Sequence, residues 1–134
     1  MSAELTWKII RKNSCFLRRQ KGIKKHFSVE PFNLRGFNSP RFNGLISRKA
    51  MDIAPAKDGH GVALSLKVPR KAGQPAKSVN VIHLRNRDKL LKSVKAIAKS
   101  QGLGVFHKLA QRRASAIFRS QQPKSKKHMK KVDA

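Results

Sequence analysis

Positive charge runs through the whole chain, and this limits what the chain can fold into more than any other feature. Lysine and arginine number 32 against 6 acidic residues in 134, which gives a formal net charge of +26. A compact body with this charge repels itself unless a polyanion neutralises it. Nucleic acid is the commonest polyanion, and each basic side chain that meets a phosphate releases a bound counterion. The spread of basic residues along the chain therefore predicts a protein embedded in nucleic acid.

The hydrophobic content of 39% allows only a small core, because a domain of this length has a large surface for its volume. We expect one domain over residues 1–122, followed by a basic tail over residues 123–134 with too few apolar residues to fold by itself. No apolar run reaches the ~18 residues that a membrane span needs. Glu4 and Lys8 interrupt the N-terminus where a signal peptide would be apolar. The sequence thus predicts an intracellular protein without a membrane partner.

The residue types that carry catalysis or bind metals are scarce. Cys15 is the only cysteine, so an intramolecular disulfide is excluded, and we expect it to be a small buried side chain. The five histidines are far apart, and the few acidic residues are not paired at short spacing. Neither common spacing of a glycine-rich phosphate loop occurs. We therefore expect no catalytic residue, no cofactor or metal ligand, and no small-molecule substrate.

The N-terminal end of the chain predicts a short helix, although a strand is also possible. Residues 3–12 suit a helix that Ser2 caps and that carries an acid in its first turn. The apolar residues Leu5, Trp7 and Ile9 alternate as they would in a strand. We favour the helix.

A β-hairpin and a long loop are predicted next. The hairpin has strands at 15–20 and 24–30, and its apolar side is formed by Phe16, Phe27 and Val29. Residues 31–44 combine turn residues with aromatic ones. Phe32, Phe37 and Phe42 in this loop either pin it to the core or stack on unpaired bases.

Two further strands are predicted at 45–54 and 61–68, joined by a turn that contains Asp58-Gly59. The second strand alternates strictly between apolar and other residues. The expected buried face of the sheet is Ile46, Met51, Ile53, Val62, Leu64 and Leu66. Residues 69–78 are rich in proline, glycine and lysine, which predicts a loop that is solvated or wrapped on phosphate.

Two helices follow, at 86–101 and 105–121. Apolar residues of the first recur at helical spacing: Leu90, Leu91, Val94, Ile97 and Ala98. Asn86 or Asp88 is a plausible start signal and Gly102 a plausible stop. In this helix Lys92, Lys95 and Lys99 lie off the apolar face.

The second helix carries a basic stripe opposite an apolar one. At about 100° per residue, the basic stripe consists of Lys108, Arg112, Ser115 and Arg119. The opposite side carries Phe106, Ala110 and Ile117, flanked by Leu109 and Ala114, with Arg113 at the edge. The segment 112–115 also resembles a basic-directed kinase site, but a serine within a helix suits a kinase poorly. Arginine binds phosphate with a planar fork, so we favour phosphate binding by this stripe.

Together these elements predict an α+β fold: a small antiparallel β-sheet packed with two C-terminal α-helices, a short N-terminal helix, and long basic loops and tail. Structured RNA suits such a body, because RNA offers irregular surfaces. We expect RNA contacts from these side chains: Arg18, Arg19, Lys24, Lys25, Arg35, Arg41, Arg48, Lys49, Arg70, Lys71, Lys92, Lys95, Lys99, Lys108, Arg112, Arg113, Arg119, Lys124, Lys126 and Lys127.

Several short stretches resemble one known family. They are Trp7 with Ile9-Ile10, Asn13-Ser14-Cys15-Phe16-Leu17, Phe27-Ser28-Val29-Glu30-Pro31, Asn33-Leu34, Asn38-Ser39, Phe42-Asn43-Gly44-Leu45-Ile46, Arg48-Lys49, Arg112-Arg113-Ala114-Ser115-Ala116-Ile117 and Arg119-Ser120-Gln121. The chain is similar to the eukaryotic large-subunit ribosomal protein number twenty-eight family over residues 5–66 and 110–123. The resemblance implies an α+β protein bound to ribosomal RNA.

The resemblance implies a structural constituent of the large (60S) subunit of the cytosolic ribosome, not an enzyme. Its partners would be large-subunit ribosomal RNA and neighbouring ribosomal proteins, without homo-oligomers. It would reside in the cytoplasm after passing through the nucleolus. The alternative is a free-standing basic nucleic-acid binder, such as a chromatin protein or a nucleolar assembly factor. The related assembly-factor family, however, has paired cysteines and a long acidic tail, which this chain lacks.

Overall fold

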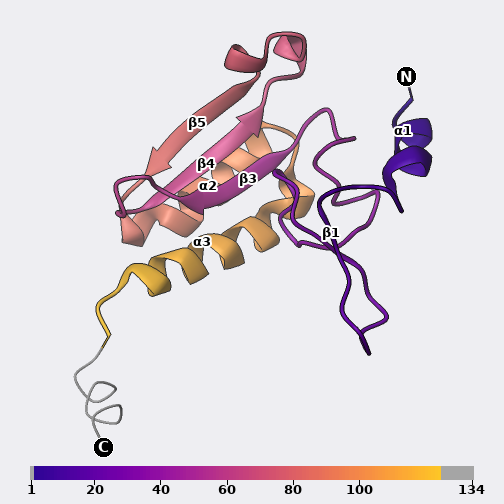
Figure 1. Cartoon of the computed structure of the whole chain (residues 1–134). Helices are drawn as coiled ribbons and strands as arrows, with labels where there is room; N and C mark the ends of the chain where they lie inside the picture. Colours follow the sequence, from indigo (N-terminus) through magenta and orange to yellow (C-terminus); the bar gives the residue numbers. More distant parts are fainter. Residues whose placement is uncertain (1, 125–134) are drawn as a thin grey trace, which may run out of the picture.

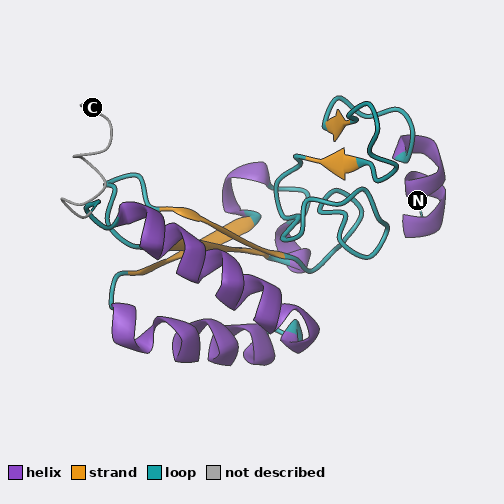
Figure 2. Cartoon of the chain, turned by 90° about the horizontal axis from the view of Figure 1, so that it is seen from below, coloured by secondary structure: helices purple, strands orange, loops and turns teal. Residues whose placement is uncertain are grey.

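The computed structural model describes residues 2–124 and is an α+β protein, as predicted. A three-stranded antiparallel sheet has the order β3-β4-β5, formed by Met51–Pro55, Val62–Lys67 and Val79–Leu84. Two helices, α2 (Arg87–Ser100) and α3 (His107–Gln121), cover one side of this sheet and the flank next to β3 (Figures 1 and 2). Both C-terminal helices begin and end close to their predicted limits.

The core lies between this sheet and the two helices. Ile53 of β3 is opposite Leu64 of β4, which is opposite Ile82 of β5, so that alternate residues of each strand face the helices. Buried side chains from both layers form one cluster: Met51, Ile53, Val62, Leu64, Leu66, Leu90, Val94, Ala98, Leu103, Ala110 and Ala114. Because α3 contributes only alanines to the fully buried set, it lies close to its neighbours.

The N-terminal half has little regular structure and lies beside one end of the sheet (Figure 2). It begins with α1 (Ala3–Ile10), whose first turn is capped when Ser2 Oγ accepts a hydrogen bond from Leu5 N at 3.2 Å. This confirms the short helix. The predicted hairpin also forms, but its strands β1 (Leu17–Arg18) and β2 (Phe27–Ser28) have only two residues each.

The loop after β2 is organised around a buried carboxylate instead of a sheet. Glu30 is 5% exposed and accepts hydrogen bonds from Ser28 Oγ, from Asn33 Nδ2 at 2.9 Å and from Gly44 N at 3.3 Å. Asn33 Oδ1 in turn accepts from Gly36 N at 2.8 Å. Since buried polar groups are costly unless they are paired, this network specifies one conformation of the loop.

Two cationic side chains fasten this loop to the sheet and to α3. Arg113 Nη1 donates to the backbone oxygen of Asn33 at 3.1 Å and lies 3.3 Å from Asp52 Oδ1. Lys67 Nζ donates to the backbone oxygen of Gly44 and, at 3.2 Å, to that of Ser47. These two side chains thus hold the N-terminal half to the core through its backbone oxygens.

Three single-turn 3₁₀ helices complete the connections. Pro69–Lys71 (η1) and Pro75–Lys77 (η2) lie between β4 and β5, and Gly104–Phe106 (η3) joins α2 to α3. Both η1 and η2 begin with proline, whose fixed φ suits the first residue of a helical turn. The segment 69–78 is exposed apart from Ser78, as expected of a loop.

The strand predicted at 45–54 was wrong in its first half. Asn43 Oδ1 accepts hydrogen bonds from Leu45 N at 2.8 Å and Ile46 N at 3.2 Å, so the chain turns there, and β3 begins only at Met51. Such side-chain bonds compete with a strand for the same backbone groups. Ile46 is accordingly only partly buried.

Further side chains are placed differently from their predictions. Val29 is 57% exposed and Leu91 45% exposed, although each was assigned to an apolar face. Cys15 is exposed, not buried. β5 was not predicted at all. No residue of β5 is fully buried, and only Ile82 and Leu84 pack in part against the core, so its apolar residues do not mark an inner face.

Candidate nucleic-acid interface

The basic stripe of α3 forms as predicted and faces an open hollow next to α2. Arg112, Ser115 and Arg119 line this hollow, which has a volume of about 390 Å³ and also contacts Leu91 of α2. A smaller adjoining hollow of about 210 Å³ is lined by Arg119 and by Arg87 at the start of α2. Two helices therefore present arginines around a partly apolar floor.

Most of the other predicted side chains are exposed but lie on separate parts of the surface. Those of α2 are Lys92, Lys95 and Lys99, and the first turn of α3 adds Lys108. The β1–β2 hairpin carries Arg18, Arg19, Lys24 and Lys25, and η1 carries Arg70 and Lys71. The remaining exposed ones are Arg35, Arg41, Arg48, Lys49 and Lys124. Lys126 and Lys127 lie outside the described residues.

Arg113 is the exception among the predicted side chains. Its side chain is 39% exposed, and its guanidinium is bound to Asp52 and to the backbone of Asn33. Arg113 lies at the edge of the apolar face of α3, where its stem covers the core and its head reaches the loop. Its position therefore serves the fold directly.

The acidic residues in the described part of the chain all have a place in the fold. Glu4 and Asp88 lie in the first turns of α1 and α2, where a negative charge favours the helix. Glu30 is in the buried network, Asp52 meets Arg113, and Asp58 Oδ2 pairs with Arg85 Nη2 at 2.7 Å. The outward basic side chains consequently face solvent with little negative charge to oppose them.

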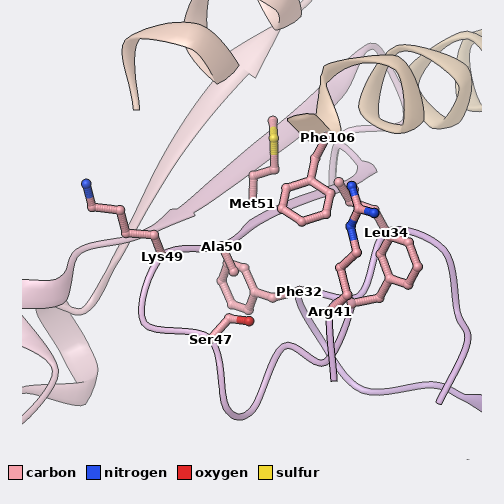
Figure 3. A pocket seen from close by; sticks show the side chains of 9 residues that line it. Phe32, Leu34, Arg41, Ser47, Lys49, Ala50, Met51 and Phe106 are labelled. Carbon is pink, nitrogen blue, oxygen red and sulfur yellow. The ribbon is translucent and has the colours of Figure 1, made fainter. Parts of the chain in front are cut away.

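The phenylalanines of the loop 31–44 are partly buried and packed within the chain. Phe37 lies 5.6 Å from Phe27, and Phe42 lies 6.1 Å from Phe106, measured between ring centroids. These contacts favour the interpretation in which the rings pin the loop. A small hollow of about 20 Å³, room for about one water, lies where Phe106, Leu34 and Met51 converge near Arg41 (Figure 3).

Residues 2–124 contain no cluster of three or more side chains that could bind a metal. No helix among these residues is both long and apolar enough to cross a bilayer.

Two cationic residues of interest were not among the predicted set. Arg87 lines the smaller hollow. Its position four residues before Leu91 indicates that the two side chains share one face of α2, and this spacing could have identified it from the sequence. Lys67 was counted with a strand, and nothing in the sequence indicates that its ammonium is tied to backbone oxygens.

Comparison with known proteins identifies the family. The family model described as the Ribosomal L28e protein family matches residues 5–120. The chain belongs to the ribosomal L28e protein family. This confirms the resemblance stated above and extends it through the stretch between residues 66 and 110.

Curated relatives of the L28e family match over most of their lengths. A "large ribosomal subunit protein eL28" of Caenorhabditis elegans is 46% identical over 134 residues, which covers 100% of both chains. Proteins of the same name from Dictyostelium discoideum and Schizosaccharomyces pombe are each 36% identical. They cover 81% and 92% of this chain and 86% and 96% of their own lengths.

Proposed function

We propose that this L28e-family chain is a structural constituent of the large subunit of the cytosolic eukaryotic ribosome and has no catalytic role. It binds ribosomal RNA through its exposed basic side chains and stabilises the folded RNA. Its relatives carry the name of a large-subunit protein. Newly made chains pass through the nucleolus and join the subunit as single copies beside other ribosomal proteins.

The observation that carries the RNA-binding part is the distribution of charge. The net charge is +26, the basic side chains point outward on several elements, and the acids of the described part are used within the fold. Such contacts neutralise phosphates and position a protein without reading sequence. A chain charged on many sides fits a partner that surrounds it, as folded RNA does.

The rival function is that of a free-standing basic protein of chromatin or nucleolar assembly. Such a protein would bind RNA or DNA through the same charges, so charge does not separate the two functions. The full-length match to a relative named as a large ribosomal subunit protein favours the ribosome.

Sucrose-gradient sedimentation with a matched pair of variants tests the proposal. The double change Arg112→Glu and Arg119→Glu reverses charge in the hollow of α3 and should remove the chain from large subunits and polysomes after a wash at about 0.5 M salt. The control, Lys57→Glu with Lys77→Glu, makes the same change in net charge at exposed lysines outside the predicted set. It should remain in the subunit fractions.

Retention of the arginine variant in washed subunits would contradict the role of α3. Recovery of the unchanged protein only at the top of the gradient, or only with nuclear precursors, would favour the rival function.

A further inference from the structure

Basic and aromatic side chains alternate in space at the edge of the N-terminal half. In order they are Lys25, Phe37, Arg35, Phe42, Arg41 and Phe106, and we call this series the cation–ring ladder. Its members come from the β1–β2 hairpin, the loop 31–44 and η3. The fold brings these members together, although Arg35, Phe37, Arg41 and Phe42 also lie within one stretch of eight residues.

The distances place each cation over at least one ring. Phe37 has Lys25 Nζ at 5.2 Å and Arg35 Cζ at 4.8 Å from its ring centroid. Phe42 has Arg35 Cζ and Arg41 Cζ both at 5.7 Å from its centroid. Arg41 Cζ is also 5.9 Å from the centroid of Phe106, and Figure 3 shows these two side chains together. All five distances fall within the ~6 Å range of cation–π attraction.

The rings are held in place, whereas the cations remain accessible. Phe37 and Phe42 are partly buried, and edge and tilted contacts tie them to Phe27 and Phe106. Lys25, Arg35 and Arg41 are exposed, and no described acidic residue forms an ion pair with them. A guanidinium that stacks on a ring keeps its N–H donors at the rim free for an anion.

We propose that the cation–ring ladder is a preformed site for the sugar–phosphate backbone of RNA. The rings fix the three cations before RNA arrives, so binding loses less side-chain freedom than it would with unrestrained arginines. Bases do not stack on Phe37 or Phe42, because the chain's own cations cover these rings. This inference rests on the proposed function and adds to it the ligand group and the role of the phenylalanines.

The test measures binding of the full chain to a labelled single-stranded oligouridylate at several salt concentrations. Phe42→Leu removes a ring but no charge, so it should weaken binding about three- to tenfold while the dependence of affinity on salt is unchanged. Arg35→Ala removes a phosphate contact, so its salt dependence should fall by about 0.7 in log–log slope. Phe16→Leu, a partly buried ring outside both the ladder and the hollows of α3, is the matched control.

Binding of Phe42→Leu as tight as that of Phe16→Leu would overturn the ladder. An abasic version of the oligomer adds a second criterion: it should bind the unchanged protein about as well as oligouridylate does. A strong preference for the base-bearing oligomer that Phe42→Leu abolishes would mean that bases stack on the ring, and would also overturn the proposal. The proposal would also be overturned if Phe42→Leu bound polyglutamate more weakly than the unchanged protein but bound RNA equally well. That result would indicate an acidic protein segment as the partner.

Two precautions keep the result interpretable. Phe37→Leu tests the other end of the ladder should Phe42→Leu fail to fold, and urea unfolding reports the fold of each variant. If the unchanged protein binds neither oligouridylate nor large-subunit RNA, the RNA-binding function itself fails. If it binds both and the ring variants match the control, only the ladder fails.

Discussion

Lys67 differs from the lysines of the surface because its side chain is half-buried and tied to the backbone. Its ammonium donates to Gly44 and Ser47 and lies 5.1 Å from the ring centroid of Phe32. Burial removes water from this ammonium, and the desolvation lowers the pKa of Lys67 from its usual 10.5. Lys67 thus stabilises the loop through hydrogen bonds and opposes folding through its lost hydration.

Replacing Lys67 with methionine should cost about 1 kcal/mol at neutral pH, since two backbone oxygens lose a charged donor. The difference in the free energy of unfolding between the unchanged protein and Lys67→Met should widen as pH rises. In the folded protein Lys67 loses its proton at lower pH than in the unfolded chain, so between the folded pKa and 10.5 the unfolded state binds more protons and stability rises with pH. Urea unfolding at neutral pH and at about pH 10 measures this.

The matched control for Lys67→Met is Lys77→Met, because Lys77 is exposed. It should leave both the stability and its pH dependence nearly unchanged. A gap between the unchanged protein and Lys67→Met that stays constant across this pH range would contradict the assigned desolvation.

Single residues were predictable where helical geometry alone decides their direction. The placement of Arg112, Ser115 and Arg119 on one stripe, and of Arg113 at the edge of the apolar face, followed from the angle per residue. The partners of Arg113 could not be predicted in this way, because Asn33 and Asp52 are distant in sequence. The loop that carries Asn33 also has no regular spacing of apolar residues.

At the scale of elements, β4, α2 and α3 were predictable because each buries one face with a regular period. β5 lies at the edge of the sheet, and only Ile82 and Leu84 are partly buried against the core. The apolar residues of β5 therefore do not follow a pattern that distinguishes an inner face from an outer one. The loop 31–44 was recognised as a loop, but its order depends on Glu30, whose role as a buried acceptor leaves no pattern.

Gly61 joins three elements, so its replacement should be costly. It has φ +87°, and a Cβ there would lie 2.5 Å from the backbone oxygen of Leu84. Its own N and O are hydrogen-bonded to the side chain of Gln121 at 3.0 and 2.9 Å. Gly61→Ala should lower the free energy of unfolding by about 2–4 kcal/mol, from strain and displacement of β5. Chemical denaturation measures this loss.

Gly59→Ala is the control for the contribution of backbone strain alone. Gly59 has φ +78°, but nothing lies within 4 Å of a Cβ built there. Gly59→Ala should lower the free energy of unfolding by about 1 kcal/mol. Equal costs at both positions would mean that the contact with β5 contributes nothing.

At the scale of the whole molecule, the net charge of +26 predicts a free protein that is more stable in salt. Ions screen the repulsion among exposed lysines and arginines, whereas the small apolar core responds little over the same range. The Tm of the isolated chain should rise by several degrees between about 20 and 300 mM NaCl. The Lys57→Glu, Lys77→Glu variant, with less net charge, should show a smaller rise. A Tm independent of salt would contradict this account.

The core cluster draws its fully buried residues from position 51 onward, and the N-terminal half adds only Leu34 to its margin. The side chains that fasten that half, Lys67 and Arg113, also come later in the chain. During synthesis the first fifty or so residues are thus made before the side chains that fasten them. The part that is made first is therefore the last to be fastened to the core.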